Sequence, residues 1–587
     1  MTGPDTRSAT RAVPIGAPSS WRMWLISERM PAALLAILVG FLVLYPLFWV
    51  VEASFRTSIL DRTYTLVWYG KVFVENSAPT VELFYHTVVL ALGSTLLAVV
   101  VGVAAALLVA RTDMPGRGAF TIVFLSPFFL TPMITAVSWT LLASPRIGLY
   151  NDLLRWVLRL DALTGPLDIY SEGGMIWVLG LYLSPYVYLF TSAALRSLDP
   201  SLEEAARMSG ASAGGTLFRV TLQLVRPAIL SSALLALILS FGQWGVPAIL
   251  GVPVRTYVLT TAIWSNMAAW PTQREYAAVL SVALLVAAFI FVWAQRRALS
   301  GRSFVTVTGR GFRAPAVALG RWRWPIAAAA WSFTVATGVM PLAALVYASV
   351  MSRWTTSLRL DLLTLRNYTG LASLEPQAFV AIANSLGLSV LGATLAISLS
   401  LFVSLCITRE RGPLARILDY VAMLPVSVPS VVFAVGLLMA YLRPPLVLYG
   451  TPYILILAYV TLFIPVGVRA STSALSQIDP ALEEAARMSG AGPIRRLAMV
   501  LVPLIRPGLV AGWVLIYISL MKEVSSSILL GSPSVPVNAT VLWSLWSLGA
   551  YGAVASFEVL CTVVMAVVAA VVLAVANRSA FQVGSRP

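Results

Sequence analysis

The sequence predicts an all-α integral membrane protein with twelve transmembrane helices in two homologous halves of six. Its 587 residues are 59% hydrophobic and only 11% charged, with a mean hydropathy of +0.86, whereas a soluble protein carries about 25% charged residues. Twelve apolar runs are long enough to cross a bilayer, which takes about 20 residues each. The ten residues LEEAARMSGA occur twice, at 202–211 and at 482–491, which indicates an internal duplication.

The apolar runs follow one another along the chain and divide it into segments. They lie near 32–53, 82–110, 119–142, 174–195, 227–250, 276–295, 325–350, 380–407, 416–441, 452–474, 507–530 and 553–576. The first has no small-residue cleavage site after it, so we expect it to remain as a span. The predicted halves are 32–295 and 325–576. The second and eighth runs are long enough to be tilted.

Arginine predicts the orientation, because short cytoplasmic loops of membrane proteins are enriched in Lys and Arg. The linker 296–324 between the halves contains seven Arg and no acidic residue, which places it in the cytoplasm. An even number of spans then places the N-terminal segment 1–31 and the tail 577–587 there too, in a prokaryotic cell membrane. The same rule accounts for the net charge of +16 without any binding of nucleic acid.

The two halves align beyond the repeated decapeptide. Arg111, Pro115 and Pro127 match Arg409, Pro413 and Pro425 at a spacing of 298, whereas Asp199 matches Asp479 at a spacing of 280. The first half therefore has about 18 additional residues in the external loop 143–173. Apolar residues at helical spacing in that loop predict a short amphipathic helix.

Each repeated segment has the pattern of a short, capped helix outside the bilayer. Asp199 is a good N-cap and Pro200 suits the first helical position. Glu203 is expected to pair with Arg207 four residues later, and Gly210 to end the helix at positive φ. One face carries small or apolar residues, which are Leu202, Ala205, Ala206 and Ser209. Because two copies are nearly identical in otherwise divergent halves, a docking helix is favoured over a solvated connector.

The repeated segment resembles the signature of the permease subunits of type I ABC importers, which is Glu-Ala-Ala, three residues, Gly, nine residues and a hydrophobic-x-hydrophobic-Pro ending. The second copy fits with Glu484, Ala485, Ala486, Gly490, Val500, Val502 and Pro503; the first fits with Glu204, Ala205, Ala206, Gly210, Val220 and Leu222, but has Gln223 in place of the final Pro. The resemblance implies that both segments, with Glu203 and Glu483, are coupling helices that dock on two copies of a cytoplasmic ABC ATPase. It also implies an extracytoplasmic solute-binding protein.

The chain itself is not expected to be an enzyme. A phosphate-binding loop needs Gly-Lys followed by Ser or Thr, and the two lysines, Lys71 and Lys522, precede Val72 and Glu523. ATP and Mg²⁺ are therefore expected on the partner ATPase, with no cofactor, metal site or catalytic residue in this chain. An intramembrane enzyme would need clustered Asp, His or Cys, which the spans lack. Cys406 and Cys561 are expected to be buried packing residues, and the single histidine, His86, a structural one.

Charged residues inside a predicted span mark a candidate translocation path. Lys522 and Glu523 lie in an otherwise apolar run, where charge is costly unless it faces a cavity or a partner. Gln243 is the counterpart of Glu523 at the 280 spacing, and Ser526 adds a hydroxyl. Two interpretations carry equal weight: these residues line the path, or they form structural bonds between the halves.

The solute is indicated only by resemblance. Residues 240–251, 257–264 and 521–533 resemble the corresponding stretches of fused ferric-iron permeases, which carry Phe-Gly-x-Pro and Lys-Glu there. Importers of aminoethylphosphonate, polyamines and thiamine are related and remain alternatives. A twelve-span secondary transporter is the alternative from another class, since the loop 111–118 has a weak similarity to that group. Such a transporter would need more intramembrane acids than Glu523, which alone qualifies clearly.

Overall fold

The computed structural model describes residues 20–58, 63–160, 163–299, 318–355, 359–409 and 412–583. Parts of three predicted cytoplasmic segments lie outside these ranges. They are residues 1–19 of the N-terminal segment, 300–317 of the linker and 584–587 of the tail.

Ten helices in the described ranges are long and apolar enough to cross a membrane, and the number of spans reaches the predicted twelve if each of two bent helix pairs counts as one span. Nine are named helices: α1 (Ser20–Ser54), α3 (Ser77–Arg111), α7 (Glu172–Ser197), α10 (Leu222–Phe241), α13 (Arg274–Leu299), α18 (Ala378–Arg409), α21 (Pro452–Leu475), α24 (Val502–Met521) and α27 (Tyr551–Val583). The tenth, Gly320–Ser349, includes α14 (Arg323–Thr334), the π-helix η6 (Val335–Val339) and α15 (Met340–Ser349). The predicted all-α membrane fold is confirmed.

The third span of each half is bent through more than a right angle. In the first half, α4 (Arg117–Phe124) and the 3₁₀ turn η2 (Ser126–Phe129) meet α5 (Pro132–Ala143) at 105°; in the second half, α19 (Pro413–Ser427) meets α20 (Ser430–Tyr441) at 106°. Pro132 and Pro429 stand at the two bends. A proline has no backbone N–H to continue a helix, so both bends have a local cause in the sequence.

The fifth span of each half starts and ends earlier than predicted. The predicted runs were 227–250 and 507–530, but α10 ends at Phe241 and α24 at Met521. Each is preceded by a five-residue π-helix, η3 (Leu217–Thr221) or η8 (Leu497–Leu501), and followed by a break and a short helix, α11 (Gly245–Leu250) or α25 (Ser527–Leu530). Apolar length alone does not show where a helix unwinds. Lys522 and Glu523 therefore lie in a break rather than inside a helix.

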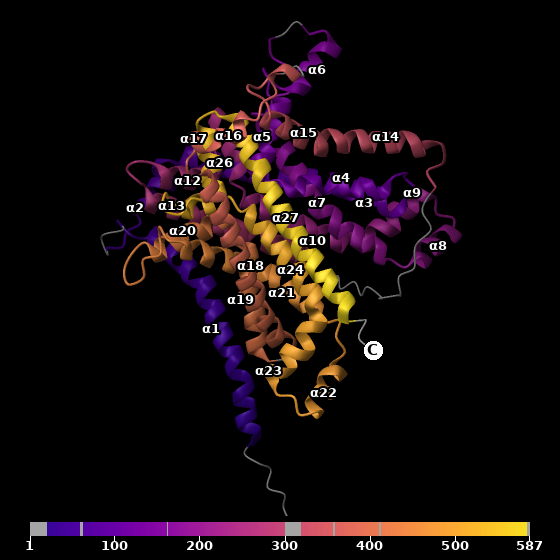
Figure 1. Cartoon of the computed structure of the whole chain (residues 1–587), viewed down its shortest axis with the longest axis vertical. Helices are drawn as coiled ribbons and strands as arrows, with labels where there is room; N and C mark the ends of the chain where they lie inside the picture. The colour runs from indigo at the N-terminus through magenta and orange to yellow at the C-terminus, as the bar shows by residue number, and fades with distance from the viewer. Residues whose placement is uncertain are drawn as a thin grey trace, which may run out of the picture.

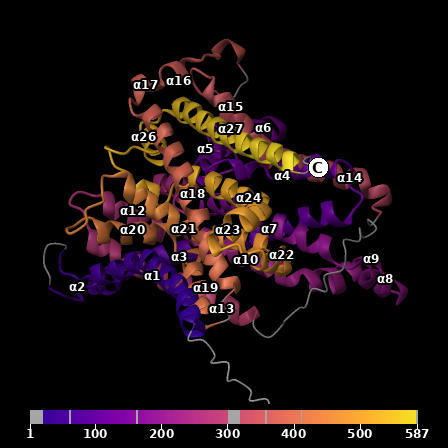
Figure 2. The same ribbon diagram turned by 60° about the horizontal axis from the view of Figure 1, so that its bottom comes forward.

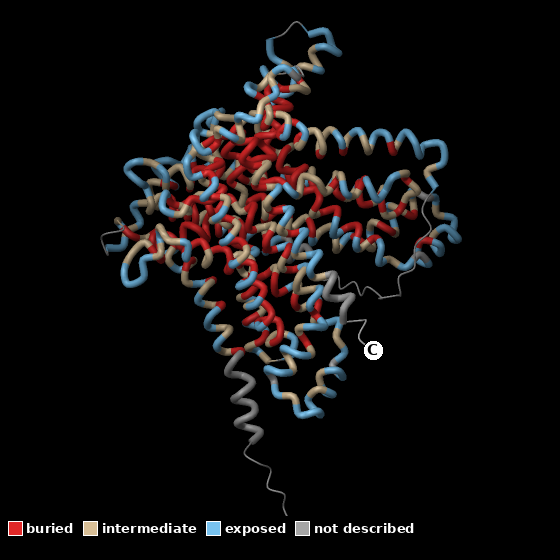
Figure 3. The backbone as a smooth tube through the Cα atoms, viewed as in Figure 1, coloured by how far each residue is buried: buried red, intermediate tan, exposed pale blue. Residues whose placement is uncertain are grey.

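Each half has a three-helix bundle, formed by α3, α7 and α10 in the first half and by α18, α21 and α24 in the second. Figure 1 shows the first bundle running to the right and the second running downward from a common centre, and Figure 2 shows the same divergence from another side. Buried residues concentrate where the bundles meet (Figure 3). A further pair of short helices matches between the halves: α12 (Leu259–Ala268) corresponds to α26 (Asn538–Ser547).

The first span of each half packs on the other half. Helix α1 lies against α19 and α20, whereas α14 and α15 lie against α4 and α5. The closest approach of α1 is at Gly436, where a Cβ atom would stand 2.4 Å from the carbonyl oxygen of Pro46. The rings of Tyr45 and Tyr441 pack nearby, with centroids 5.7 Å apart. This exchange joins the two halves into one body.

The additional loop of the first half contains the predicted amphipathic helix, α6 (Leu149–Leu158). It projects from the rest of the molecule at the top of Figure 1. The buried Asn151 amide anchors the loop by donating hydrogen bonds to the carbonyl oxygens of Ala143, Ser144 and Leu167, at 3.3, 2.9 and 2.8 Å. The Leu153 and Trp156 side chains remain exposed.

We expect Gly436→Leu to separate α1 from the second half, because the added side chain would meet the backbone of Pro46. Overpacking of this kind costs about 1–3 kcal/mol, so thermal unfolding of the detergent-solubilised protein should start at a lower temperature. Gly40→Ala is the matched control on α1, since a Cβ there meets nothing within 4 Å. Equal melting temperatures for the two variants would contradict the described packing.

Candidate functional site

The two repeated segments form matching short helices, α8 (Pro200–Met208) and α22 (Pro480–Met488). Asp199 caps α8 by accepting a hydrogen bond of 2.9 Å from the Ser201 N–H, and Asp479 caps α22 through the Ala481 N–H at the same distance. The Ser201 N–H lowers the pKa of the Asp199 carboxyl below its usual value. Gly210 and Gly490 follow the helices at φ of 85° and 77°, so both ends are as predicted.

Glu203 anchors α8 to the first bundle. We predicted a pair with Arg207 on the helix surface, but the Glu203 carboxylate is buried and turns toward the bundle. Its Oε1 lies 3.4 Å from Arg111 Nη2 and accepts a 2.8 Å hydrogen bond from the Thr221 hydroxyl. The Glu203–Arg207 prediction is therefore wrong, because Arg111 at the end of α3 provides a more enclosed partner that sequence spacing cannot show.

Glu483 connects α22 to the second bundle at the corresponding position, but it is only partly buried. Its Oε1 lies 2.6 Å from Arg409 Nη2 and 3.6 Å from Arg496 Nη1. Arg409 is the last residue of α18, as Arg111 is of α3, and these arginines match in the sequence alignment of the halves. Helices α8 and α22 are thus each connected to the end of the second span of their own half.

The opposite face of each helix is exposed and partly apolar. The exposed residues of α8 and of its C-terminal end include Leu202, Glu204, Ala205 and Ser209, whereas Ala206 is half-buried. In α22, likewise, Ala485 is exposed and Ala486 is half-buried. Met208 and Met488, which we had not singled out, are 89% and 88% exposed. Large apolar side chains on an otherwise polar surface mark interaction sites. Figures 1 and 2 place α8 and α22 at the ends of the two bundles.

The breaks after α10 and α24 meet at the centre of the molecule around a cavity of about 140 Å³. The lining combines both halves: Pro132, Tyr182, Leu183, Tyr186, Leu239, Gln243 and Gly245 from the first and Phe463, Ser519, Lys522, Glu523, Val524 and Ser525 from the second. Three of the four predicted path residues, Gln243, Lys522 and Glu523, therefore line one space. Ser526 lies behind the wall, where its N–H and hydroxyl donate to Glu523 Oε1 at 2.9 and 3.1 Å.

Lys522 joins the second half to the bend of the first. Its ammonium donates a hydrogen bond to the carbonyl oxygen of Phe128 and lies 4.1 Å from the centroid of the Phe128 ring. The Glu558 carboxylate on α27 interacts electrostatically with Lys522 and accepts a hydrogen bond from the Thr131 N–H at the same bend. We had not considered Glu558, although a single carboxylate within an apolar run is a detectable signal.

A cluster of three tryptophans stands next to the cavity. Trp244 directly follows Gln243, and its ring centroid lies 5.3 Å from that of Trp264 and 5.2 Å from that of Trp543. Trp264 on α12 and Trp543 on α26 occupy corresponding positions of the halves and are 4.8 Å apart. Trp264 also lines a second cavity of about 250 Å³ that includes Arg274 and Gly531. The cluster therefore connects the neighbour of a residue that lines the central cavity, Gln243, with a residue that lines the second one, Trp264.

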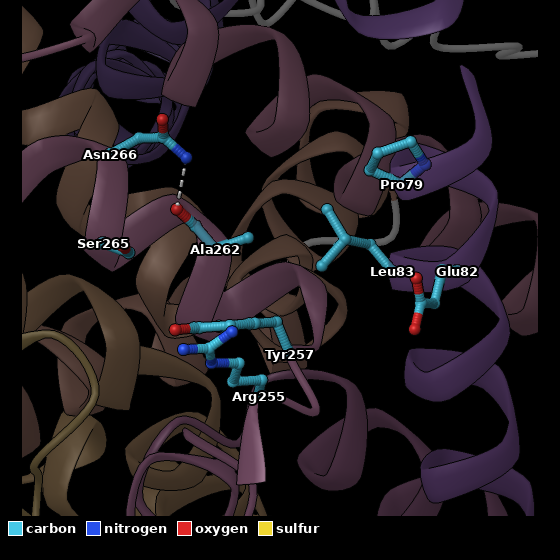
Figure 4. A pocket seen from close by; sticks show the side chains of 8 residues that line it. All are labelled: Pro79, Glu82, Leu83, Arg255, Tyr257, Ala262, Ser265 and Asn266. Atoms are coloured by element: carbon cyan, nitrogen blue, oxygen red, sulfur yellow. Dashed lines mark hydrogen bonds between the residues drawn. The ribbon is translucent and has the colours of Figure 1, made fainter. Parts of the chain in front are cut away.

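A third cavity, of about 270 Å³, opens at the start of α3 (Figure 4). Glu82 and Leu83 stand on one side of it, and Arg255, Tyr257 and Asn266 on the other. The neighbouring His86 lies between two carboxylates: its Nδ1 lies 3.0 Å from Glu172 Oε1 and its Nε2 lies 3.5 Å from Glu82 Oε1. Among the residues that the structure describes, no three His, Cys, Asp or Glu side chains are grouped as metal ligands.

Comparison with known proteins gives a family match over both halves. Residues 98–300 and 389–583 each match the family described as "binding-protein-dependent transport system inner membrane component". The two matched regions together cover more than half of the chain, and each contains one of the helices α8 and α22 and one break.

Three relatives illustrate the similarity. The ferric transport system permease protein FbpB of Actinobacillus pleuropneumoniae is 26% identical over 68% of this chain, and the alignment spans only 58% of that relative. The probable ABC transporter permease protein y4fN of Sinorhizobium fredii is 29% identical over 73% of this chain and 76% of its own length. The Fe(3+)-transport system permease protein FbpB 2 of Haemophilus influenzae is 24% identical over 90% of this chain and 94% of its own length.

We expect Glu203→Gln to loosen α8 from the bundle, because it removes the charge that Arg111 faces in a buried position. Breaking a buried ion pair leaves an uncompensated charge, so backbone amides of α8 should exchange with deuterium at least about tenfold faster, corresponding to about 1.4 kcal/mol. Glu204→Gln, one residue along and exposed, is the matched control. Equal exchange rates in the two variants would refute the anchoring role.

We expect Trp543→Ala to connect the central cavity with the second one. In a protein whose two native cysteines are replaced by Ala, a cysteine introduced at Gln243 should react severalfold faster with a membrane-impermeant maleimide added outside the cell. Trp546→Ala is the control, because Trp546 lies on the same helix but packs on Tyr551, with centroids 5.2 Å apart. An unchanged labelling rate would show that the cluster is not the barrier.

Proposed function

Because the chain belongs to the family of binding-protein-dependent transport system inner membrane components, we propose that it forms the membrane pathway of an ATP-driven importer of ferric iron. Both halves of one translocation pathway are present in this single multi-pass membrane chain. Membership in this family leaves the secondary-transporter alternative without support. The observation that carries the proposal is the pair of matching exposed helices, α8 and α22, one at the end of each bundle.

Two copies of a cytoplasmic ABC ATPase are the proposed partners of these helices. Two identical exposed faces fit two identical docking surfaces, and ATP and Mg²⁺ belong to the ATPase. The Arg-rich linker and the Arg-containing N-terminal segment support a cytoplasmic position for both termini and both docking helices. The Leu202, Ala205 and Met208 side chains of α8, with their counterparts on α22, would enter the ATPase surface.

Closure of the ATPase pair would move the two docking helices, and each helix is bonded to its own bundle. The Glu203–Arg111 and Glu483–Arg409 contacts lead directly to the ends of α3 and α18. Movement of these helices would change how the bundles meet at the central cavity. Access to the cavity would thereby alternate between the two sides of the membrane, with cargo delivered by an extracytoplasmic binding protein.

Ferric iron is the proposed cargo because of the relatives. Two of the three are ferric or Fe(3+) transport permeases by name, and this agrees with the resemblance of residues 240–251 and 521–533. Aminoethylphosphonate, polyamine and thiamine are the alternative cargoes within the same importer class, and a competition experiment separates them.

We expect cells that lack this gene to take up radiolabelled ferric iron slowly under iron limitation, and the restored wild type to recover uptake. A Glu204→Arg/Glu484→Arg double variant should not recover it, because it reverses the charge on both exposed docking faces, and it should no longer copurify with the ATPase. Glu75→Arg, another exposed acidic residue, is the control. Inhibition of uptake by excess aminoethylphosphonate or putrescine would reassign the cargo, whereas full activity of the double variant would refute the docking assignment.

A further inference from the structure

The central cavity brings oxygen atoms of the two halves together. Tyr182 and Tyr186 lie one turn apart on α7, and their hydroxyl groups are hydrogen-bonded to each other. Glu523 lines the opposite side, and its carboxylate interacts electrostatically with Tyr182. The Gln243 side chain lines the same space. One carboxylate and two phenol groups thus converge on a cavity between the halves.

The Glu523 carboxylate is held in place by its own backbone. Besides the Ser526 contacts, it accepts hydrogen bonds from the Ser525 N–H and the Ser430 hydroxyl. Hydrogen bonds to the charged form of a carboxylate favour that form. The arrangement therefore fixes the position of this carboxyl group, and with it two oxygen atoms, at the cavity wall.

Lys522 would repel a cation if its ammonium were free in the cavity. Instead the ammonium bonds to the Phe128 carbonyl oxygen and interacts with Glu558. Glu558 thus offsets part of the Lys522 charge, and Glu523 is the carboxyl group that lines the cavity. The Phe128 ring, which Lys522 covers, packs on Tyr186 with centroids 5.2 Å apart, so the lysine also supports one of the tyrosines.

We propose that the central cavity is a transient site for a trivalent metal cation, bound by the Glu523 carboxylate and the phenolic oxygens of Tyr182 and Tyr186. Hard cations select oxygen ligands, and the carboxylate and the two phenol groups supply oxygen atoms that can coordinate a trivalent ion. A cavity of about 140 Å³ has room for an ion and a few waters, since a water takes about 30 Å³. A single carboxylate suits cargo that must leave again. The inference rests on the proposed function for its cargo.

Binding of Fe³⁺, supplied as ferric citrate to the full-length permease in lipid nanodiscs, tests the ligands directly. We expect one bound ion per chain and a visible absorption band from phenolate coordination to iron, with the phenolic protons released to citrate and buffer. Glu523→Gln should weaken binding at least about tenfold, because it removes the carboxyl group that lines the cavity. Tyr182→Phe and Tyr186→Phe should each reduce the band. Tyr188→Phe is the matched control on α7, since its hydroxyl bonds to Thr121 at 2.8 Å instead.

The Lys522–Glu558 pair gives a second test that does not depend on removing a ligand. Glu558→Gln leaves the ammonium unbalanced and should weaken Fe³⁺ binding, whereas Lys522→Met removes the repelling charge and should strengthen it. If the pair were only structural, both variants would impair the protein alike. Similar losses in the two variants would therefore overturn the neutralising role, and the Lys522→Met/Glu558→Gln double variant should bind as the wild type does.

The outcomes separate this site from the proposed function. A wild type that restores ferric iron uptake in cells, together with a Glu523→Gln variant that imports and binds iron equally well, would overturn the site and leave the importer function intact. Saturable binding of a phosphonate that requires Lys522 would overturn the cation assignment. Copurification of each variant with the ATPase shows that it is folded, and the Tyr186→Phe variant, which loses one oxygen, remains informative if Glu523→Gln does not fold.

Discussion

The central constraint on this structure is that a broken helix inside an apolar bundle must find partners for its freed backbone groups. An unpaired N–H or C=O group away from water is costly, and irregular backbone at membrane depth occurs only where protein or a cavity surrounds it. This chain has two bends and two breaks that meet at the centre. Lys522 satisfies the Phe128 carbonyl, Glu558 the Thr131 N–H and Glu523 the N–H groups of Ser525 and Ser526. The cavity exists because these irregular segments meet and are satisfied there.

The duplication repeats the breaks but not their chemistry. Gly242 and Gln243 in the first half correspond to Lys522 and Glu523 in the second. Gly242 lies against the bend of the second half, where an added Cβ would stand 3.6 Å from Pro429 Cα, whereas Lys522 crosses to the bend of the first half by a side-chain hydrogen bond. The Gln243 carbonyl oxygen accepts a 2.7 Å hydrogen bond from the Thr260 hydroxyl. In the first half the groups at the break are neutral, whereas in the second half they are the ionisable side chains of Lys522 and Glu523, which also determine the polarity of the cavity.

The sequence allowed prediction of the features that local chemistry determines, and missed those that need tertiary contacts. The apolar runs indicated the spans, and Asp199 and Gly210 indicated both ends of α8, because capping and positive φ are local preferences. Apolar length could not indicate the break at Gly242 or Lys522. The partner of Glu203 was mistaken because Arg111 is distant in sequence. Glu558 was overlooked because the group that it binds, the Thr131 N–H at a bend, becomes visible only in the fold.

A continuous series of contacts links α8 to the central cavity. Glu203 of α8 faces Arg111 at one end of α3, and further along the same helix the Ser94 hydroxyl lies 2.7 Å from the Ser240 hydroxyl of α10. Ser240 stands two residues before the break at Gly242. In the second half the Tyr459 hydroxyl of α21 bonds to Ser527 at the start of α25, at 2.8 Å. Because the breaks interrupt the regular backbone hydrogen bonds of a continuous helix, a movement applied at α8 or α22 would be taken up mainly next to the cavity.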